Sequence, residues 1–529
     1  MRREASRAAT YGLIAILLMA AILRFYKVDQ PFIDATSWRQ SDTATIADNF
    51  YRGNWNIFYP KISWNGPGDQ VVGYEFQTIS YLAALLYRIV GQHDWVCRAI
   101  AIVFGVWGIF AFYQLLRRVW GQNYAVVGAA VLALLPGAVY VDRSFLPDPV
   151  MLSLVITSVW LLVAYLQTEK LHYLLLASLA GIFGFLTKIS GLIVGIPMLY
   201  AIVTILGQKQ NRRLKQLTLI AGAGVVTLIP VIAYYAWALH LFRTQPPYYV
   251  AAGEYWVWKY GLSRFLEQNY FLPKLLYQLR WFWTLPVIVL AIVGLFLRPP
   301  SHNEYKAPWL FHIWMLAFGF YYAIAAQGLV NNPTNLNLSN PATAALTAHS
   351  LIKIAAWIRA KLGTRASLAW MAVVLLLIGG LGQRALHRFA LRPFAEQDFK
   401  LGLALRQAAQ TNELVVTATS TPGDAVTVYY SQRRGWVFPP LYAWSSSLSQ
   451  LEDEEGIRLL KELAGKGADW FGLVKPEQFA SQHPQLMEYL DRNLSHYQAS
   501  PEFTIYRIGP KKGTSIDAPF SSNVRNETN

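Results

Sequence analysis

Apolar residues in this chain gather into blocks of about 18 to 22, each long enough to cross the hydrocarbon core of a bilayer as a helix. Of the 529 residues, 54% are hydrophobic and 14% are charged. A typical soluble protein has about 25% charged residues. The blocks and the composition together predict a polytopic α-helical membrane protein. The single cysteine, Cys97, excludes an intrachain disulfide.

The net charge of +16 raises the question of a nucleic-acid partner. In a membrane protein, however, lysine and arginine concentrate in the short cytoplasmic connections between spans. The basic residues of this chain flank the apolar blocks in that way, so we expect membrane lipid and no nucleic acid as a partner.

Two blocks decide the number and the direction of the spans. The first, 9–26, follows a basic flank, as the apolar part of a signal peptide would. No small-residue cleavage site follows, so we expect a retained helix with a cytoplasmic N-terminus. The second block, 76–91, is short and contains Arg88. We expect it to lie along the membrane surface as an amphipathic helix.

With 76–91 outside the bilayer, about eleven spans are predicted. They are 9–26, 96–116, 122–141, 149–167, 171–187, 189–207, 216–240, 281–298, 308–327, 341–358 and 367–383. The connections on the N-terminal side are then all short and basic, as the positive-inside rule requires. If 76–91 crossed the membrane instead, the polybasic stretch 209–215 would fall outside.

The same topology divides the chain. Residues 1–383 form a transmembrane module with two large outer loops, 27–95 and the aromatic loop 241–280. Residues 384–509 form a small C-terminal α/β domain on the extracytoplasmic side, and the polar tail 510–529 is expected to be disordered. The protein is therefore expected in the plasma membrane.

The C-terminal domain is predicted from alternating helix and strand patterns. We expect helices over 397–411, 447–467 and 476–493, and strands over 413–419, 424–431, 468–475 and 503–509. It contains no P-loop, glycine-rich nucleotide motif or metal-ligand spacing. An accessory domain is favoured over a nucleotide site.

Charged residues gather on the outer side. The first loop carries Asp34, Arg39 and Asp42, and the turn before the fourth span carries Arg143 and Asp148. Each aspartate also has a structural interpretation. Asp34 and Asp148 are placed to cap helices, and Asp42 could be solvated on the surface of its helix. Several carboxylates on one membrane face are nevertheless typical of a site for acid–base chemistry.

Three cations add to this face. Lys188 interrupts a long apolar stretch at its outer boundary, and Lys259 and Arg264 lie in the aromatic loop. Such residues can extend along the bilayer to reach water, or they can bind the phosphate of a lipid-linked substrate. The sequence leaves both interpretations open.

The order of these segments resembles a known class. "DATSWRQSDTATIADNFYRGNW" follows the first span, then come "YEFQTISYLAALLYRIVG", "FLPDPVMLSLVITSVWLLVAYL" and "GIFGFLTKISGLIVGIPMLY". The chain resembles the GT-C class of integral-membrane glycosyltransferases. Within it, the chain is most similar to the family of protein O-mannosyltransferases and the lipid A aminoarabinose transferase. The resemblance covers about residues 9–380.

The resemblance implies an inverting transfer of a sugar from a polyprenyl-phosphate carrier to a hydroxyl acceptor on the outer face of the membrane. A carboxylate would take the proton of the attacking hydroxyl. Cations would stabilise the departing phosphate. The acceptor, whether protein, lipid or envelope glycan, and the sugar stay unspecified.

Residue by residue, Asp148 and Lys188 match the family's acid after the third span and its lysine in "LTK". Glu75 in "YEFQ" matches the family's outer glutamate. The expected Asp-Glu position of the first loop holds Arg39 and Gln40, so the acid is displaced to Asp34 or Asp42. We expect Asp34, followed by Asp42, to be the base.

A second departure lies in 328–344, where the family has a histidine and two tyrosines. This chain has Asn331 and Asn332 there. In some relatives a divalent metal joins the outer glutamate and a histidine. Here Glu75 is the only metal-ligand candidate, so no cofactor is assigned and a divalent metal stays an open alternative.

Two other function classes compete with the enzyme. A non-catalytic membrane subunit of glycan assembly is favoured by the altered 328–344 segment and opposed by Asp34, Asp148 and Lys188. A transporter or flippase typically shows two related halves and charges at the midplane. No repeat is evident in this chain, and its charges lie at span ends.

Overall fold

The computed structural model describes residues 2–53, 55–209, 213–249, 271–300, 306–330, 332–421, 423–440 and 451–508. The chain forms two compact units. Unit 1 comprises Met1–Ile62 and Gly68–Glu396, and unit 2 comprises Ser63–Pro67 and Gln397–Asn529. A short piece of the first loop thus belongs to the C-terminal unit. The predicted tail 510–529 lies outside the described residues.

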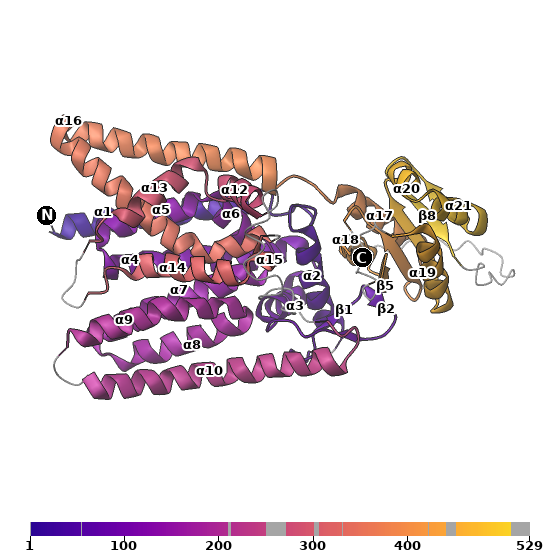
Figure 1. Ribbon diagram of the computed structural model, residues 1–529, viewed down its shortest axis with the longest axis horizontal. Coiled ribbons are helices and arrows are strands. Elements are labelled where there is room, and N and C mark those ends of the chain that lie inside the picture. The colour runs from indigo at the N-terminus through magenta and orange to yellow at the C-terminus, as the bar shows by residue number, and fades with distance from the viewer. Residues whose placement is uncertain are drawn as a thin grey trace, which may run out of the picture. The chain divides into compact units, whose positions relative to one another are not determined.

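Unit 1 is a bundle of helices with two short strands in its first loop (Figure 1). The helices are α1 (Arg2–Phe25), α2 (Ser37–Arg52), α3 (Thr78–Val90), α4 (Asp94–Val119), α5 (Gln122–Leu134), α6 (Pro136–Arg143), α7 (Pro147–Thr168), α8 (Leu171–Thr187), α9 (Gly195–Gly207), α10 (Arg213–Thr244), α12 (Phe271–Phe282), α13 (Leu285–Phe296), α14 (Leu310–Ile324), α15 (Ala326–Leu329) and α16 (Asn340–Ala385). Three short helical turns are η1 (Ile189–Val194), η2 (Pro333–Ser339) and η3 (Leu386–Ala390). The strands are β1 (Lys61–Ile62) and β3 (Gln70–Val71), which pair antiparallel.

Helices stand at all eleven predicted spans. Among the described residues, six are long and apolar enough to cross a bilayer, and there are up to eight if the bent pairs α5–α6 and α12–α13 each count as one span. The helices α8 and α14 are shorter, and α16 is interrupted at Gly363, whose φ is 87°. The chain is an integral membrane protein. The number eleven stays a prediction.

Helix α3 covers the block that is predicted to lie along the membrane surface. Its 13 residues would extend about 20 Å at 1.5 Å per residue, short of the roughly 30 Å hydrocarbon core. One face is buried, whereas Leu85, Leu86, Ile89 and Val90 are exposed. Length and amphipathicity both suit a helix in the membrane interface.

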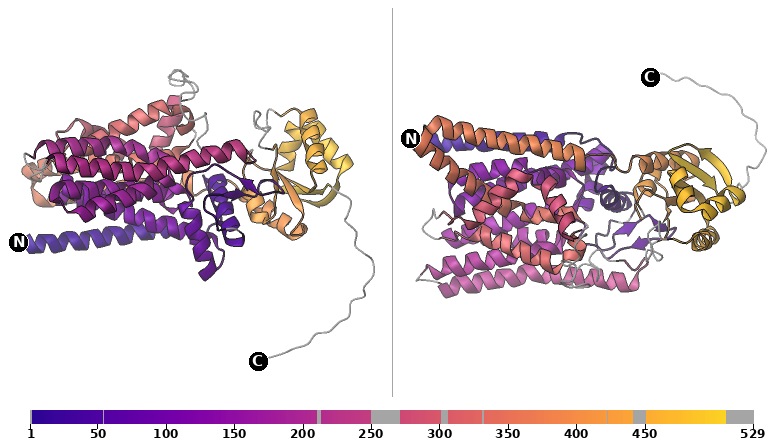
Figure 2. Two further views of the ribbon diagram at one scale, coloured as in Figure 1. Left: turned by 90° about the horizontal axis from the view of Figure 1, so that it is seen from below. Right: turned by 45° about the horizontal axis from the view of Figure 1, so that its top comes forward.

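The bundle has two distinct ends. The N-terminus, the start of α10 and the interruption of α16 lie at one end, and α2 and α3 lie at the other (Figure 1). Helices α8, α9 and α10 run side by side between the two ends (Figures 1 and 2).

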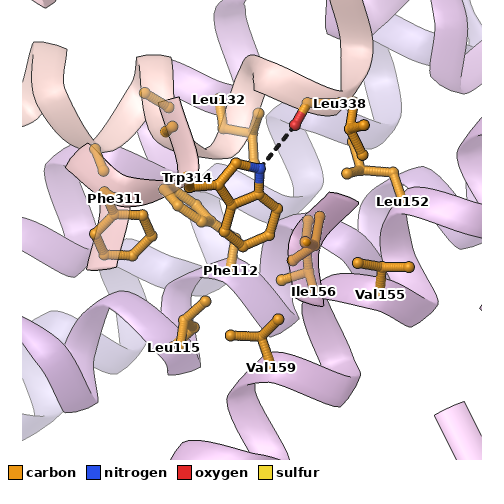
Figure 3. Close-up of a cluster of buried hydrophobic side chains, with 14 of the residues drawn as sticks. Phe112, Leu115, Leu132, Leu152, Val155, Ile156, Val159, Phe311, Trp314 and Leu338 are labelled. Atoms are coloured by element: carbon orange, nitrogen blue, oxygen red, sulfur yellow. Dashed lines mark hydrogen bonds between the residues drawn. The ribbon is translucent and has the colours of Figure 1, made fainter. Parts of the chain in front are cut away.

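The short turn η2 is held in the core of unit 1, where it packs against α6 and α7 as well as against α14. Trp314 of α14 is fully buried and its indole N–H donates to the Leu338 carbonyl oxygen, 3.0 Å away (Figure 3). Around the ring pack Phe112 of α4 and Ile156 of α7 (Figure 3). A buried tryptophan normally needs a partner for its N–H, and here that partner is the η2 backbone.

Unit 2 is a mixed sheet with flanking helices. The strand order is β2-β5-β4-β6-β8-β7, in which β5, β4 and β6 run parallel. The strands are β2 (Asn65–Gly66), β4 (Leu414–Ala418), β5 (Gly435–Val437), β6 (Ala468–Val474), β7 (Ser495–Ala499) and β8 (Phe503–Arg507). The helices are α17 (Glu396–Ala408), α18 (Val426–Ser431), α19 (Asp453–Gly465), α20 (Pro476–Gln482) and α21 (Pro484–Asn493).

The predicted strand 424–431 is wrong, because Val426–Ser431 is helical. Its β-branched residues suggested a strand, but Asp424 accepts a hydrogen bond from the Val426 N–H at 2.9 Å and starts a helical turn. The sheet position is taken by Gly435 instead. A β-carbon at Gly435 would lie 1.8 Å from the Val415 carbonyl oxygen, so only glycine fits. The part of the predicted helix before residue 451 lies outside the described residues.

Candidate active site

Two elements of the first loop, helix α2 and the β1–β3 strand pair, position its charged residues. Helix α2 carries Arg39 and Asp42 on buried or partly buried positions. The β1–β3 pair leads directly into Tyr74 and Glu75. The chain there is held by the Gly73 N–H, which donates to the Tyr249 carbonyl oxygen at 2.9 Å.

Arg39 is the centre of the first cluster. Its guanidinium donates to Asp42 Oδ2 at 2.7 Å and to Glu75 Oε1. The same group lies 4.6 Å from the centre of the Tyr74 ring, whose hydroxyl hydrogen-bonds Asp42. One guanidinium therefore serves two carboxylates. The side chains of Arg39 and Glu75 are 16% and 11% exposed, and that of Asp42 is 3% exposed.

The electrostatics of this cluster follow from its composition. Burial alone would lower the pKa of Arg39, but Glu75, Tyr74 and Asp42 outweigh it and hold that pKa above its ordinary value. Burial, with a contribution from the Asp42 charge, raises the pKa of the Tyr74 hydroxyl. Arg39 and Tyr74 thus stay protonated near neutral pH, and with both acids ionised the cluster carries one excess negative charge.

Lys188 is the centre of the second cluster. It follows α8, and its ammonium group lies 2.8 Å from Asp148 Oδ1 and 3.2 Å from Asn335 Oδ1. Asp148 lies in the first turn of α7, and Asn335 lies in η2. The Lys188 side chain is 22% exposed, so part of the cation is accessible to a ligand.

Two contacts place the clusters side by side. The Phe76 N–H, one residue beyond Glu75, donates to the Leu186 carbonyl oxygen at 3.1 Å, two residues before Lys188. The hydroxyls of Thr78 and Thr187 are 2.8 Å apart. The structure therefore brings the Arg39–Asp42–Glu75 cluster close to the Lys188 cluster.

Asp34 lies in a different environment. It is fully buried, and its Oδ2 is 3.1 Å from Arg98 and 3.6 Å from Arg143. Its Oδ1 accepts hydrogen bonds from Gln40 at 2.6 Å and from the Tyr140 hydroxyl at 2.9 Å. Both carboxylate oxygens are occupied, which suits a structural tie between α2, α4 and α6. Arg143 shares this role.

Three participants were not predicted as site residues from the sequence. Tyr74 and Asn335 had no charge to mark them, although Asn335 lies in the segment that departs from the family. Arg98 lies within the predicted span 96–116 and was not singled out. A buried pair of Arg24 and Asp142, 2.7 Å apart, was also not predicted, because the two residues are 118 positions apart in the sequence.

A divalent metal does not fit this arrangement. Among the described residues, no three histidine, cysteine, aspartate or glutamate side chains gather in one place. Glu75, the candidate ligand, is already paired with the Arg39 guanidinium, which would oppose a second cation. The predicted substrate-binding residues Lys259 and Arg264 lie outside the described residues, as does Asn331.

Comparison with known proteins supports the resemblance found in the sequence. Residues 78–237 match the family model described as dolichyl-phosphate-mannose-protein mannosyltransferase. The Bacillus subtilis (strain 168) protein YkcB, named as a mannosyltransferase, is 28% identical over 181 residues, which is 33% of this chain and 24% of YkcB. The rice (Oryza sativa subsp. japonica) oligosaccharide–protein glycosyltransferase subunit STT3B is 25% identical over 227 residues, 40% of this chain and 30% of that protein. The chain thus spans less than a third of either relative.

Solved structures of low identity share the fold. ArnT from Cupriavidus metallidurans in the apo state has a TM-score of 0.62 at 12% identity, covering 95% of this chain and 100% of ArnT. The same protein bound to undecaprenyl phosphate has a TM-score of 0.61 at 11% identity, covering 96% of this chain and 99% of ArnT. The oligosaccharyltransferase AglB from Archaeoglobus fulgidus has a TM-score of 0.58 at 11% identity, covering 96% of this chain and 75% of AglB. The predicted GT-C-like fold with a C-terminal α/β region is confirmed.

Proposed function

We propose that this protein is a membrane glycosyltransferase that moves a sugar from a polyprenyl-phosphate carrier to an acceptor hydroxyl, with inversion at the anomeric carbon. The matched family model and the similarity to a protein solved with undecaprenyl phosphate support the class of donor. The observation that carries the proposal is the association of the Arg39–Asp42–Glu75 cluster with the Lys188–Asp148–Asn335 cluster.

Lys188 binds the donor phosphate in this mechanism. In the free protein its charge is balanced by Asp148, 2.8 Å away, and its partial exposure leaves room for a second anion. As the bond between the anomeric carbon and the phosphate oxygen breaks, negative charge grows on the departing phosphate. A cation already in position stabilises that charge without reorganisation.

Asp42 is the base. Arg39 neutralises only one of its two carboxylate partners, so the cluster retains one charge with which to accept a proton. Hydrogen bonds from Arg39 and Tyr74 orient Asp42, while the more exposed Glu75 balances Arg39. The acceptor hydroxyl attacks the anomeric carbon, its proton passes to Asp42, and polyprenyl phosphate leaves.

The choice of Asp42 differs from the sequence-based preference for Asp34. That preference stays a prediction, but Asp34 is held by two arginines, Gln40 and Tyr140, which leaves no side open to an acceptor. Asp34 and Asp42 therefore make a discriminating pair of variants, because they lie in the same loop and only one belongs to the proposed site.

The test is incubation of purified protein with a panel of polyprenyl-phosphate sugars and measurement of released polyprenyl phosphate. The wild type should release the carrier from one donor. Asp42→Asn should lower the rate about 10²–10⁴-fold, as typical for a lost general base. Asp34→Asn should keep the turnover of its folded fraction and lose stability instead. Full turnover in Asp42→Asn together with none in folded Asp34→Asn would restore Asp34 as the base.

The proposed setting is the plasma membrane, with the N-terminus in the cytoplasm and the site and C-terminal unit outside. The basic residues Arg213, Lys215, Arg359, Lys361 and Arg365 support this orientation. They belong to the start of α10 and the interruption of α16, at the N-terminal end of the bundle (Figure 1). An outer site suits lipid-linked donors whose sugar is presented outside the cell.

A further inference from the structure

Three segments far apart in the sequence meet at the bundle end opposite the N-terminus. They are the end of α1, the helix α12 and the stretch that follows α16. The Tyr26 and His387 rings are 5.3 Å apart, and the Tyr277 and Phe389 rings are 5.5 Å apart. The Ala35 N–H donates to the Ala390 carbonyl oxygen at 3.1 Å. These contacts make one continuous surface of unit 1.

This surface is strongly basic. We name its five exposed cations the basic collar: Lys27, Arg280, Arg384, Arg388 and Arg392. Among the described residues none of the five takes part in an ion pair. Two exposed acids, Asp29 and Glu396, belong to the same segments, so the collar keeps a net positive charge.

Apolar side chains accompany the collar. Phe25 and Tyr26 of the α1 end are each 45% exposed, Leu276 and Tyr277 of α12 are 46% and 54% exposed, and Phe394 is 53% exposed. Such side chains lower the free energy when they enter the boundary between lipid head groups and acyl chains. Cations beside them then lie at the depth of the lipid phosphates.

The position of the collar identifies its counter-charge. Two candidate spans, α1 and α16, end here beside α12, the first half of the bent pair α12–α13, so the surface lies at a membrane boundary. The end is the one opposite the N-terminus, where basic residues are normally depleted. Five cations at such a boundary, on the same segments as exposed aromatic rings, complement the phosphates of an anionic membrane surface. A soluble acidic partner would leave the rings in water.

We propose that the basic collar binds the head groups of anionic phospholipids in the leaflet that surrounds the proposed active site. The collar is separate from Lys188, and the proposal is independent of sugar transfer. Electrostatic attraction of this kind concentrates anionic lipid by up to about fivefold per cation close to the surface, and it weakens with ionic strength.

The experiment labels an introduced cysteine. The single native cysteine, Cys97, is buried and so does not compete for the label. In a Leu276→Cys variant the exposed position can be labelled with a fluorophore beside the collar. The labelled protein is placed in nanodiscs of phosphatidylcholine with 20% phosphatidylglycerol, where either lipid carries brominated, quenching acyl chains. Per mole of quencher, brominated phosphatidylglycerol should quench at least threefold more than brominated phosphatidylcholine.

The collar variant combines Lys27→Gln, Arg384→Gln, Arg388→Gln and Arg392→Gln. The ratio of quenching by brominated phosphatidylglycerol to quenching by brominated phosphatidylcholine should fall to about one in this variant. High salt should lower the same ratio in the labelled protein with an intact collar. The control neutralises Arg359, Lys361 and Arg365, which flank the interruption of α16 at the opposite end of the bundle, and it should leave the ratio unchanged. Elution volume and melting temperature verify that each variant is folded.

Two results would overturn the proposal. One is equal quenching by the two brominated lipids in the unsubstituted protein. The other is displacement of phosphatidylglycerol by equimolar polyprenyl phosphate, which would make the collar a carrier site. Because the readout needs no sugar donor, it is unaffected if the proposed transfer activity is absent.

Discussion

Asn335 shows how a neutral side chain can take part in an electrostatic site. Its Oδ1 accepts from Lys188 at 3.2 Å, and its own amide donates to the Asn332 carbonyl oxygen at 3.1 Å. The second contact fixes the amide, so the oxygen faces the lysine. The segment that departs from the family pattern therefore still contributes to the candidate site, through a residue type that the family pattern did not suggest.

Replacement of Asn335 should affect donor binding more than turnover. Asn335→Ala removes one of the groups that hold Lys188 and should raise the donor KM about three- to tenfold with a smaller change in kcat. Asn335→Asp should raise KM further, since a second carboxylate competes with the phosphate for Lys188. Initial rates over a donor series measure both constants. Asn337→Ala, in the same turn but away from Lys188, is the control, and an equal KM effect there would refute the role of Asn335.

Asp48 gives a pH-dependent prediction for stability. Burial raises its pKa to about 7, although Arg52, 3.9 Å away, opposes the shift. The folded protein thus holds a proton that the unfolded chain releases near pH 4. The stability contributed by this proton is complete below about pH 4 and is lost as the pH rises through about 7.

Asp48→Asn should therefore stabilise the protein at pH 8, by on the order of 3 kcal/mol, and have little effect at pH 4.5. Melting temperatures at the two pH values measure the difference. The exposed Asp29 provides the control, because Asp29→Asn should shift the two melting temperatures by the same small amount. A uniform gain for Asp48→Asn across the pH range would contradict the buried-proton explanation.

At the scale of elements, the sequence predicted helices better than strands. Apolar blocks located most of the candidate membrane helices, because lipid permits few alternatives to a helix, but most of α12 falls in the predicted outer loop 241–280. In unit 2 the pattern of 424–431 favoured a strand, yet local capping by Asp424 made it a helix. The strand Gly435–Val437 was not predicted, since nothing in three residues reveals the close approach of a neighbouring backbone.

Gly435 provides a direct test of this close approach. Gly435→Ala should destabilise unit 2 by about 1–3 kcal/mol or prevent its folding, because the new β-carbon would clash with the Val415 carbonyl group. The thermal unfolding transition of the full-length protein reports the change. Gly465→Ala, at the end of α19 with open space around it, should be neutral or slightly stabilising. Equal stability of the two variants would show that the sheet tolerates a side chain at Gly435.

The course of α3 can be tested with reporter fusions. If α3 lies along the membrane surface, fusions at Gly121 and Gly207 should both report the cytoplasm, because each then follows an even number of crossings. Gly121 lies between α4 and α5, and Gly207 is the last residue of α9. An external signal at Gly207 would require α3, or another helix before it, to be reassigned. Fusions truncate the chain, so a signal from a full-length protein labelled at the same positions is the control.

At the scale of the whole molecule, composition predicted the membrane class, and the resemblance to a known family predicted the fold. They did not predict that Asp34 is enclosed. A sequence shows that an aspartate is present in a loop, whereas its enclosure depends on Arg98, Arg143 and Tyr140, which come from three later positions. Pairing of this kind is a property of packing, and no local pattern carries it.

The pairing of strand β2 restricts how many times the chain can cross the membrane. The strand lies in the first loop, between α1 and α3, and it pairs with β5, which follows the last membrane helix. Two paired strands share one side of a bilayer, so the chain between them must cross an even number of times. With α3 excluded, ten of the predicted spans separate the two strands, and ten is even. If α3 also crossed, the total would be odd and the strands could not meet. The pairing of Asn65 and Gly66 with β5 thus limits the number of crossings between the two strands to an even value.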